Sequence, residues 1–241
     1  MCTVTILPIG KDDFVLTSNR DEAPERETLV PQVYAILDTE MMFPKDKVAG
    51  GTWIGVSKKN RMICLLNGGF EIHERRPEYA QSRGLVVIDL LAATHLLEAI
   101  DEYDLKNVEP FTLVMADWNN GLNFFELVWD GIQKYVQEIP RSPRIWSSST
   151  LYTASMKNER QQWFNEFISR TSIGPKDILK FHQTSHIDNS EYGVVMSRSY
   201  VKTTSITQII KTKDQLTMTF DNLQNNLRAY SDLKLPRSIH G

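Results

Sequence analysis

Thr3-Val4-Thr5-Ile6-Leu7 and Phe14-Val15-Leu16-Thr17-Ser18 are apolar, β-branched runs separated by turn-forming residues, and together they predict a β-hairpin. Side chains alternate between the two faces of a strand, so every second residue shares a face. A turn centred on Lys11 places Cys2 opposite Arg20 on one face. A register shifted by one residue would place Asn19 or Asp21 there instead, so the partner of Cys2 stays open among these three.

Cys2 follows Met1 directly, and a small second residue favours removal of an initiator methionine. The α-amine of Cys2 would then have a pKa of about 7.7–8.0 and could accept a proton near neutral pH. A thiol titrates at about 8.5, and an adjacent arginine favours its thiolate. Nucleophile and base would then occupy a single residue, which is the logic of N-terminal nucleophile catalysis. Taken alone, Cys2 would be an incidental N-terminal residue.

Four pieces of sequence, in this order, resemble the NRDE family, which is also named for transport and Golgi organisation protein 2. They are Met1-Cys2-Thr3, Ser18-Asn19-Arg20-Asp21-Glu22, Gly50-Gly51-Thr52-Trp53-Ile54-Gly55, and Asn67 with Ser82-Arg83-Gly84. Their spacing matches over about the first 90 residues. Because that family has the N-terminal nucleophile hydrolase fold, the resemblance implies an α+β fold, a four-layer αββα sandwich. We expect one domain over residues 1–241.

The resemblance also implies roles for individual side chains. Arg20 would stabilise the thiolate of the nucleophile Cys2, and Asp21 would hold its α-amine by a charge-assisted hydrogen bond. Asn67 would donate to the oxyanion of the reaction. Four residues would contact the substrate: Asn19, Trp53, Arg83 and Ser148.

Each of these residues also has a purely structural interpretation. Residues 19–22 could form the polar end of a strand, and Asn67 could be a plain turn residue before two glycines. Gly51 could mark a close approach of two backbones, with Trp53 in the core. Arg83 could simply lie at the start of a helix, where it would remain available for a substrate carboxylate.

Two segments depart from the family pattern. Residues 147–149 are all serine where relatives often have Leu-Ser-Asn, which puts a second oxyanion donor in doubt. Thr203 stands where relatives commonly have an arginine, which removes one expected cationic contact to the substrate.

Composition limits the class of protein. The chain has 241 residues, of which 41% are apolar and 24% charged, as in an ordinary globular protein. A net charge of −3 provides no electrostatic attraction to nucleic acid, and no apolar run approaches the length of a membrane span. Two cysteines and no basic leader indicate a reducing, cytoplasmic setting. We expect Cys64 to be a buried strand residue.

Hydrophobic periodicity predicts the remaining elements. We expect helices over 83–92, 94–100, 156–170 and 175–182, and strands over 33–36, 50–56, 61–66, 111–117, 122–129, 132–139, 194–196, 204–210 and 216–220. Residues 23–49 otherwise indicate a long loop, and 222–241 show no clean period. His182 and His186 lack a third ligand fixed by sequence, so we expect a structural role and no metal site.

The predicted function is therefore that of a cysteine N-terminal nucleophile hydrolase, acting without a cofactor on a non-peptide C–N bond of an amide, or on a related acyl bond, once Met1 is removed. The alternative is a non-catalytic binding or trafficking protein for lipid or haem on the same fold, since the family resembled is linked to the handling of such molecules. The expected partner is a small amide, acyl or lipid-like molecule, with haem under the alternative. Nucleic acid and stable membrane insertion are not expected, and the oligomeric state stays open.

Overall fold

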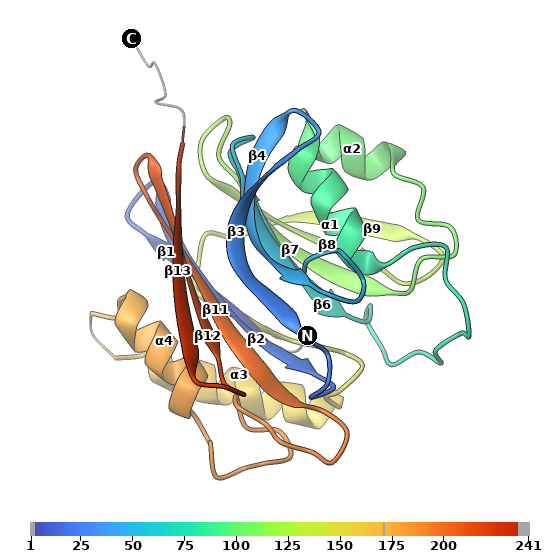
Figure 1. Cartoon of the computed structure of the whole chain (residues 1–241). Helices are drawn as coiled ribbons and strands as arrows, with labels where there is room; N and C mark the ends of the chain where they lie inside the picture. Colours follow the sequence, from blue (N-terminus) through green and yellow to red (C-terminus); the bar gives the residue numbers. More distant parts are fainter. Residues whose placement is uncertain (1–2, 171, 236–241) are drawn as a thin grey trace.

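The computed structural model describes residues 3–170 and 172–235, which form two antiparallel β-sheets and four helices (Figure 1). The first sheet has the strand order β10-β1-β2-β11-β12-β13, and the second has the order β3-β4-β5-β6-β7-β8-β9. The strands of the first sheet are β1 Thr3–Ile9, β2 Asp13–Glu22, β10 Arg144–Ser147, β11 Lys202–Thr212, β12 Gln215–Asn222 and β13 Leu227–Lys234. Those of the second are β3 Thr28–Ile36, β4 Thr39–Asp46, β5 Ile54–Ser57, β6 Arg61–Asn67, β7 Phe111–Asp117, β8 Asn123–Trp129 and β9 Lys134–Ile139.

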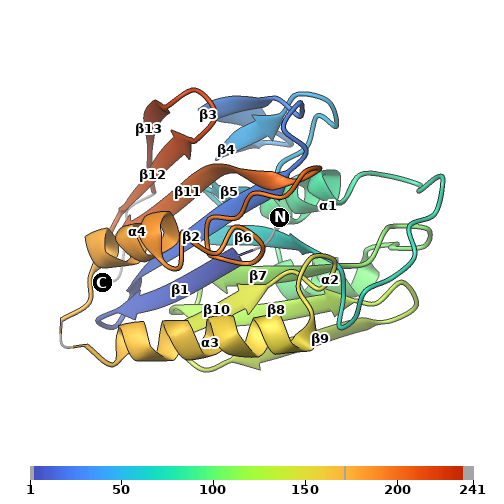
Figure 2. The ribbon, with the colours of Figure 1, turned by 90° about the horizontal axis from the view of Figure 1, so that it is seen from below.

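The helices cover the outer faces of the two sheets. Contacts join α1 Arg83–Ala92 to β5 and β6 of the second sheet, and α1 also packs on α2 Leu96–Glu102. On the other side, α3 Ala154–Ile168 packs on β10, and α4 Pro175–Thr184 packs on β2 and β11, as Figure 2 shows from below. The predicted α+β fold with αββα layers is confirmed.

The predicted N-terminal hairpin is confirmed, and its strands pair in the register that a turn centred on Lys11 predicts. Thr3 pairs with Asn19, and Ile6 pairs with Leu16. Ile6 and Leu16 belong to the large apolar core between the two sheets, whereas Val15 belongs to a smaller core under α3 and α4. Even-numbered positions of β1 and β2 therefore face the second sheet. Cys2 lies outside the described residues, so its predicted place opposite Arg20 remains a prediction.

The prediction of a long loop over residues 23–49 is wrong, because β3 and β4 form a hairpin there, although the short strand predicted at 33–36 falls within β3. Pro24, Pro31 and Pro44 suggested a loop, but Pro24 precedes β3 and the other two are accommodated within β3 and β4. Pro31 falls at the irregularity in pairing between Leu29 and Gln32 of the edge strand β3. Pro44 lies beyond the two residues of β4 that pair with β5, where no ladder hydrogen bond is required.

Three other differences concern short or exposed strands. The predicted strand at 194–196 is wrong, because these residues form no strand: the N–H of Val194 donates to the carbonyl of Ser185, and Met196 bonds to Thr203 of β11. β10 and β13 were not predicted, because β10 is short and β13 is largely exposed and lacks a continuous apolar run. In contrast, the helix predicted over 83–92 begins and ends at the expected residues. Across residues 3–170 and 172–235, each helix is too short or too polar to cross a membrane.

Candidate functional site

A pocket of about 70 Å³ brings four of the predicted residues together. Arg20 near the end of β2, Trp53 before β5, Asn67 at the end of β6 and Arg83 at the start of α1 all line it. These positions are far apart in sequence and are joined only by the packing of the two sheets and α1. The remaining pocket residues include the charged side chains of Glu22, Arg26 and Asp46.

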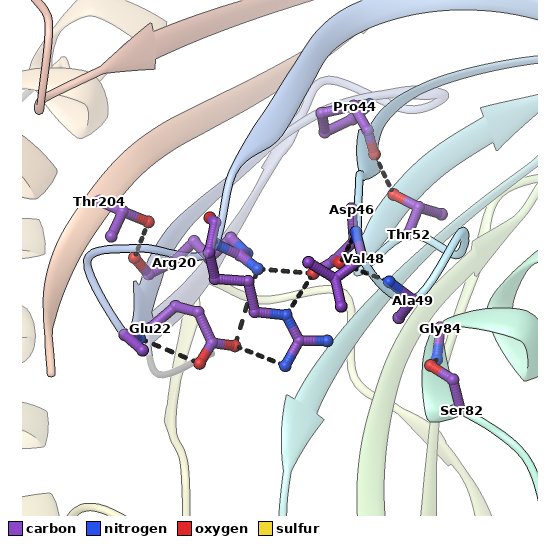
Figure 3. A network of polar contacts seen from close by, with 12 residues as sticks. Arg20, Glu22, Pro44, Asp46, Val48, Ala49, Thr52, Ser82, Gly84 and Thr204 are labelled. Carbon is purple, nitrogen blue, oxygen red and sulfur yellow. Dashed lines mark hydrogen bonds and ion pairs between the residues drawn. The ribbon is translucent and has the colours of Figure 1, made fainter. Parts of the chain in front are cut away.

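Arg20 is the buried cation of this pocket, with 2% of its surface exposed. Its Nη2 donates to Oδ2 of Asp46 at 2.8 Å (Figure 3), and its guanidinium carbon lies 4.7 Å from the ring centroid of Trp53. Glu22 Oε2 lies 3.6 Å from the same Nη2. Burial lowers the pKa of Arg20, whereas Glu22 and Asp46 raise it. Because a guanidinium stays protonated in proteins, the pocket retains a fixed positive charge.

Asp46 connects this arginine to the second sheet. Its carboxylate also accepts hydrogen bonds from the backbone N–H groups of Val48 and Ala49 (Figure 3), and one of 2.7 Å from Nε of Arg26. Burial raises the pKa of Asp46, but the N–H of Ala49 and the guanidinium groups of Arg26 and Arg20 outweigh burial, so the pKa lies below its ordinary value. Sequence reasoning missed Asp46, since it placed this segment in a loop.

Gly51 and Gly84 bring the start of α1 against the segment before β5. The N–H of Thr52 donates to the carbonyl of Gly84, and a Cβ added to Gly51 would lie 2.5 Å from the carbonyl carbon of Gly84. The predicted close approach of two backbones is therefore confirmed. It places the adjacent residues Trp53 and Arg83 in the same pocket. Trp53 is only 3% exposed, so it is both a pocket wall and a core residue.

Arg83 and Asn67 are held by neighbouring loops. Arg83 Nη2 lies 3.0 Å from Oε2 of Glu109, and its Nη1 donates to the carbonyl of Pro110. The carbonyl of Asn67 accepts a hydrogen bond of 2.6 Å from the hydroxyl of Ser148. Ser148 itself is buried and does not line the pocket around Arg20. Its side chain nevertheless fixes the end of β6 against the segment that follows β10.

Asp21 lies on the opposite face of β2 from Arg20. Its carboxylate accepts hydrogen bonds from the hydroxyl of Tyr152, at 2.8 Å, and from that of Thr203, at 2.5 Å. Thr203 is the residue that replaces the arginine common in relatives, so here a short neutral donor approaches the carboxylate. Sequence reasoning missed Tyr152, which follows the polar run 147–150 and carries no motif.

Asn19 is directed away from the pocket, toward α4. Its Nδ2 donates to the carbonyls of His182 and Val194, so its Oδ1 accepts from Nδ1 of His182 at 2.7 Å. The structure therefore does not bring Asn19 together with Arg20. Burial, together with the charge of Arg160, lowers the pKa of His182 to about 3, so the imidazole is neutral at physiological pH. Nε2 of this imidazole lies 2.8 Å from Oγ1 of Thr5.

Arg160 of α3 is a second buried cation near the start of β1, and sequence reasoning missed it. Its guanidinium donates to the hydroxyls of Thr3 and Ser147 and lies 4.1 Å from the ring centroid of Tyr152. It also donates to the carbonyls of residues 192 and 193. The only signal in the sequence was one arginine in a polar helix, which normally indicates an exposed side chain.

Two further observations limit the chemistry of the described residues. Among residues 3–170 and 172–235, no three His, Cys, Asp or Glu side chains are grouped so that they could hold a metal ion. Cys64 is buried as predicted, and burial raises the pKa of its thiol to about 12. A thiol with so high a pKa is almost entirely protonated at neutral pH and is a poor nucleophile.

Comparisons with known proteins agree with this architecture. The family described as Transport and Golgi organisation 2 matches residues 1–229. No curated protein matches the sequence. Among solved structures, penicillin V acylase from Agrobacterium tumefaciens is similar, with a TM-score of 0.60, 10% identity, and coverage of 96% of this chain and 86% of that one.

Two other solved structures are similar at comparable identity. A variant of conjugated bile acid hydrolase from Clostridium perfringens has a TM-score of 0.53 and 10% identity, with coverage of 96% of this chain and 92% of that one. The Caenorhabditis elegans orthologue of N-acylethanolamine-hydrolysing acid amidase has a TM-score of 0.57 and 14% identity, with coverage of 86% of this chain and 92% of that one. At these identities the likeness shows the fold, which is that of N-terminal nucleophile hydrolases.

Proposed function

The chain belongs to the transport and Golgi organisation 2 family, and from this premise we propose that it is a cysteine N-terminal nucleophile hydrolase with Cys2 as its nucleophile. Its substrate is an amide, cleaved at a non-peptide C–N bond, or a compound with a related acyl bond. The fold supports this proposal, because similar folds occur in a bile acid hydrolase, a penicillin acylase and an acid amidase. The activity requires removal of Met1.

The strand register near the N-terminus carries the proposal. Thr3 pairs with Asn19 of β2 on one side and with Ser147 of β10 on the other. Cys2 lies outside the described residues, and the proposal takes it to face Arg20, as the sequence predicts. Even-numbered positions of β1 face the second sheet, and the backbone carbonyl of Asn67 in that sheet accepts a hydrogen bond from Ser148. We infer that Cys2 is next to the buried guanidinium of Arg20.

The proposed reaction proceeds through an acyl-enzyme. The α-amine of Cys2 takes the proton of its own thiol, and the thiolate attacks the substrate carbonyl. Arg20 stabilises the thiolate, while Asn67 and a backbone N–H stabilise the oxyanion. The protonated amine donates its proton to the leaving nitrogen, and the C–N bond breaks. Water then hydrolyses the thioester, which releases a carboxylic acid and restores the thiol.

Other residues would prepare this reaction. Asp46 fixes the guanidinium of Arg20, and the hydroxyls of Tyr152 and Thr203 fix the carboxylate of Asp21. In this proposal Asp21 holds the α-amine of the nucleophile by a charge-assisted hydrogen bond. Trp53 and Arg83 line the pocket and contact the substrate.

Mass spectrometry of the purified full-length chain tests this proposal. We expect an intact mass that lacks Met1 and a covalent acyl adduct on Cys2 after treatment with an activated acyl thioester or amide. The Cys2→Ala variant should fold and form no adduct. A Cys64→Ala variant is the matched control and should form the adduct normally, because its buried thiol does not take part. A chain that retains Met1, or a label confined to Cys64, would contradict the proposal.

A binding or trafficking protein for lipid or haem is the second candidate. It is favoured by the neutral threonine that contacts Asp21 where relatives carry a cation, and by the absence of a carboxamide at residues 147–149. Such a protein requires neither a free Cys2 amine nor turnover. Binding of haem or a fatty acyl ligand to Cys2→Ala with unchanged affinity, together with no turnover of an amide panel by the wild type, would favour this second function.

A further inference from the structure

A second cleft, of about 300 Å³, adjoins the contact between Asn67 and Ser148. Ser148 lines it, whereas Asn67 lines the smaller pocket around Arg20. Several of its walls are apolar, and α3 contributes Lys157. The apolar lining residues are Leu66, Phe70, Val128, Ile145 and Trp146.

This cleft lies at the edge of the first sheet, where β10 meets both the second sheet and α3. Leu66 pairs with Thr112, and Thr112 pairs with Val128, so these three side chains share one face of the second sheet. Trp146 pairs with Val4 of the first sheet and packs against the core between the sheets. A ligand in the cleft would therefore reach the inner layer of the sandwich, which the even-numbered positions of β1 face.

Lys157 brings a half-buried positive charge to this cleft. Its Nζ donates to the hydroxyl of Ser149 at 2.7 Å, and within residues 3–170 and 172–235 no carboxylate forms an ion pair with it. The carboxylate of the cleft, Glu126, accepts instead from the side chains of Trp146, at 2.5 Å, and Gln137, at 2.6 Å. The ammonium group is therefore left without a counter-charge from this part of the chain.

The position of Lys157 costs free energy in two ways. Burial lowers the pKa of Lys157, which reflects the loss of water around its ammonium group. The residue also lies near the N-terminus of α3, where the helix dipole disfavours a cation, and the first turn contains no acidic side chain. An anion placed against Nζ would relieve both costs.

The hydrogen-bond geometry indicates how such an anion would be held. The hydroxyl of Ser149 donates to the carbonyl of Gly69 at 2.5 Å, so its oxygen is an acceptor toward Lys157. An ammonium group has three donors, and Ser149 uses one. Two N–H groups remain, which matches the two oxygens of a carboxylate.

We propose that this cleft binds the apolar body of a ligand whose carboxylate pairs with Lys157. The inference deepens the proposed function and rests on it, since it assigns to the hydrolase a substrate class: acyl compounds that carry a carboxylate away from the bond that is cleaved. Leu66, Phe70 and Trp146 contact the apolar body, and Lys157 selects the anionic group.

Isothermal titration calorimetry with three ten-carbon probes tests this site on the full-length chain. Decanoate should bind the wild type, and Lys157→Met should weaken that binding about tenfold or more, because a hydrogen bond to a charged group is lost. Decanol should bind the wild type and the variant within about twofold of each other. Lys180→Met, which removes an exposed lysine from α4, is the matched control and should bind decanoate like the wild type.

Four results would overturn the carboxylate site. The first is that decanoate does not bind the wild type, and the second is that Lys157→Met binds decanoate as tightly as the wild type does. The third is that Lys157→Met loses as much affinity for decanol as for decanoate. The fourth is that the wild type binds decyl phosphate more tightly than decanoate. The Cys2→Ser variant separates this inference from the hydrolase. If the wild type forms no acyl-enzyme, while Lys157→Met still weakens decanoate binding in the Cys2→Ser background, the hydrolase proposal fails and the carboxylate site stands. If acyl-enzyme forms but Lys157→Met binds decanoate normally, the site fails and the hydrolase stands.

Discussion

Arg20 and Asp46 join the two sheets through a buried hydrogen bond of 2.8 Å between Nη2 and Oδ2. Arg20 belongs to β2 of the first sheet, and Asp46 ends β4 of the second. The same guanidinium lies over the ring of Trp53. The cation is thus fixed from the opposite sheet, next to the strand position at which the nucleophile is proposed. This contact relates the stability of the sandwich to the electrostatics of the site.

Replacing Asp46 by Asn should destabilise the protein by about 3 kcal/mol, because it leaves the buried guanidinium of Arg20 without its carboxylate partner. Urea unfolding followed by circular dichroism measures this change. Glu27→Gln is the matched control, since it removes the exposed ion pair between Glu27 and Lys47, and its unfolding midpoint should equal that of the wild type. Equal midpoints for all three proteins would show that Asp46 does not stabilise the fold.

The same carboxylate makes a defined contribution to the pH dependence of stability. Burial raises the pKa of Asp46, but the N–H of Ala49 and the guanidinium groups of Arg26 and Arg20 lower it below the ordinary value. Between the folded and unfolded pKa values, the unfolded chain binds a proton that the native protein does not, so stability rises with pH. The stabilisation should be complete above about pH 4 and lost as pH falls through the lowered folded pKa.

Unfolding free energies of wild type and Asp46→Asn, measured from neutral pH down to acid pH, check this dependence. The difference between the two proteins should be constant above about pH 4 and shrink below it. A difference that is independent of pH across this window would contradict a lowered pKa of Asp46.

Gly51→Ala and Gly84→Ala should each destabilise the protein by about 1–3 kcal/mol, because the new Cβ would meet rigid backbone atoms. The added Cβ of Gly51 lies 2.5 Å from a carbonyl carbon, and that of Gly84 lies 2.9 Å from a carbonyl oxygen. Gly174→Ala is the control, since only a carboxylate oxygen 3.8 Å away would meet its Cβ. Thermal unfolding of the three variants checks the order of their stabilities. A smaller loss of stability for Gly51→Ala than for Gly174→Ala would contradict this prediction.

Tyr152→Phe should slow formation of the acyl-enzyme, because it removes a hydroxyl that positions the carboxylate of Asp21. The lost hydrogen bond to a charged group should also lower the free energy of unfolding by about 1.5–3 kcal/mol. Tyr192→Phe is the matched control, as it removes a hydroxyl–carboxylate contact to Glu159 away from the hairpin. Comparable adduct rates for Tyr152→Phe, Tyr192→Phe and the wild type would exclude a positioning role for Tyr152.

Local patterns predicted much of the fold. The register of the first hairpin follows from a tight turn around Lys11, and the helix at 83–92 follows from its apolar periodicity and the capping hydroxyl of Ser82. The β3–β4 hairpin escaped prediction because Pro31 and Pro44 indicate a loop unless the pairing irregularities that accommodate them are known. Such irregularities depend on tertiary contacts that no short window of sequence contains.

The residues of the candidate site likewise fall into two groups: those that sequence motifs predicted and those that no motif marked. Residues carried by motifs, such as Arg20 and Trp53, were predicted and lie together in one pocket. Asp46, Tyr152 and Arg160 each contact at least one partner 26 or more positions away in sequence, so no motif marks them. Their importance follows only from burial and hydrogen bonding in the folded chain.

The pH dependence of Cys2 alkylation tests the central claim most directly. The rate with iodoacetamide, followed by peptide mass spectrometry, should report a thiol pKa below the ordinary value of about 8.5, and Arg20→Met should raise it. Arg61→Met, which removes a buried arginine bonded to the carbonyls of Leu90 and Thr94, should leave the pKa of Cys2 unchanged. An identical pKa of Cys2 in wild type and Arg20→Met would contradict the claim that Arg20 activates the nucleophile.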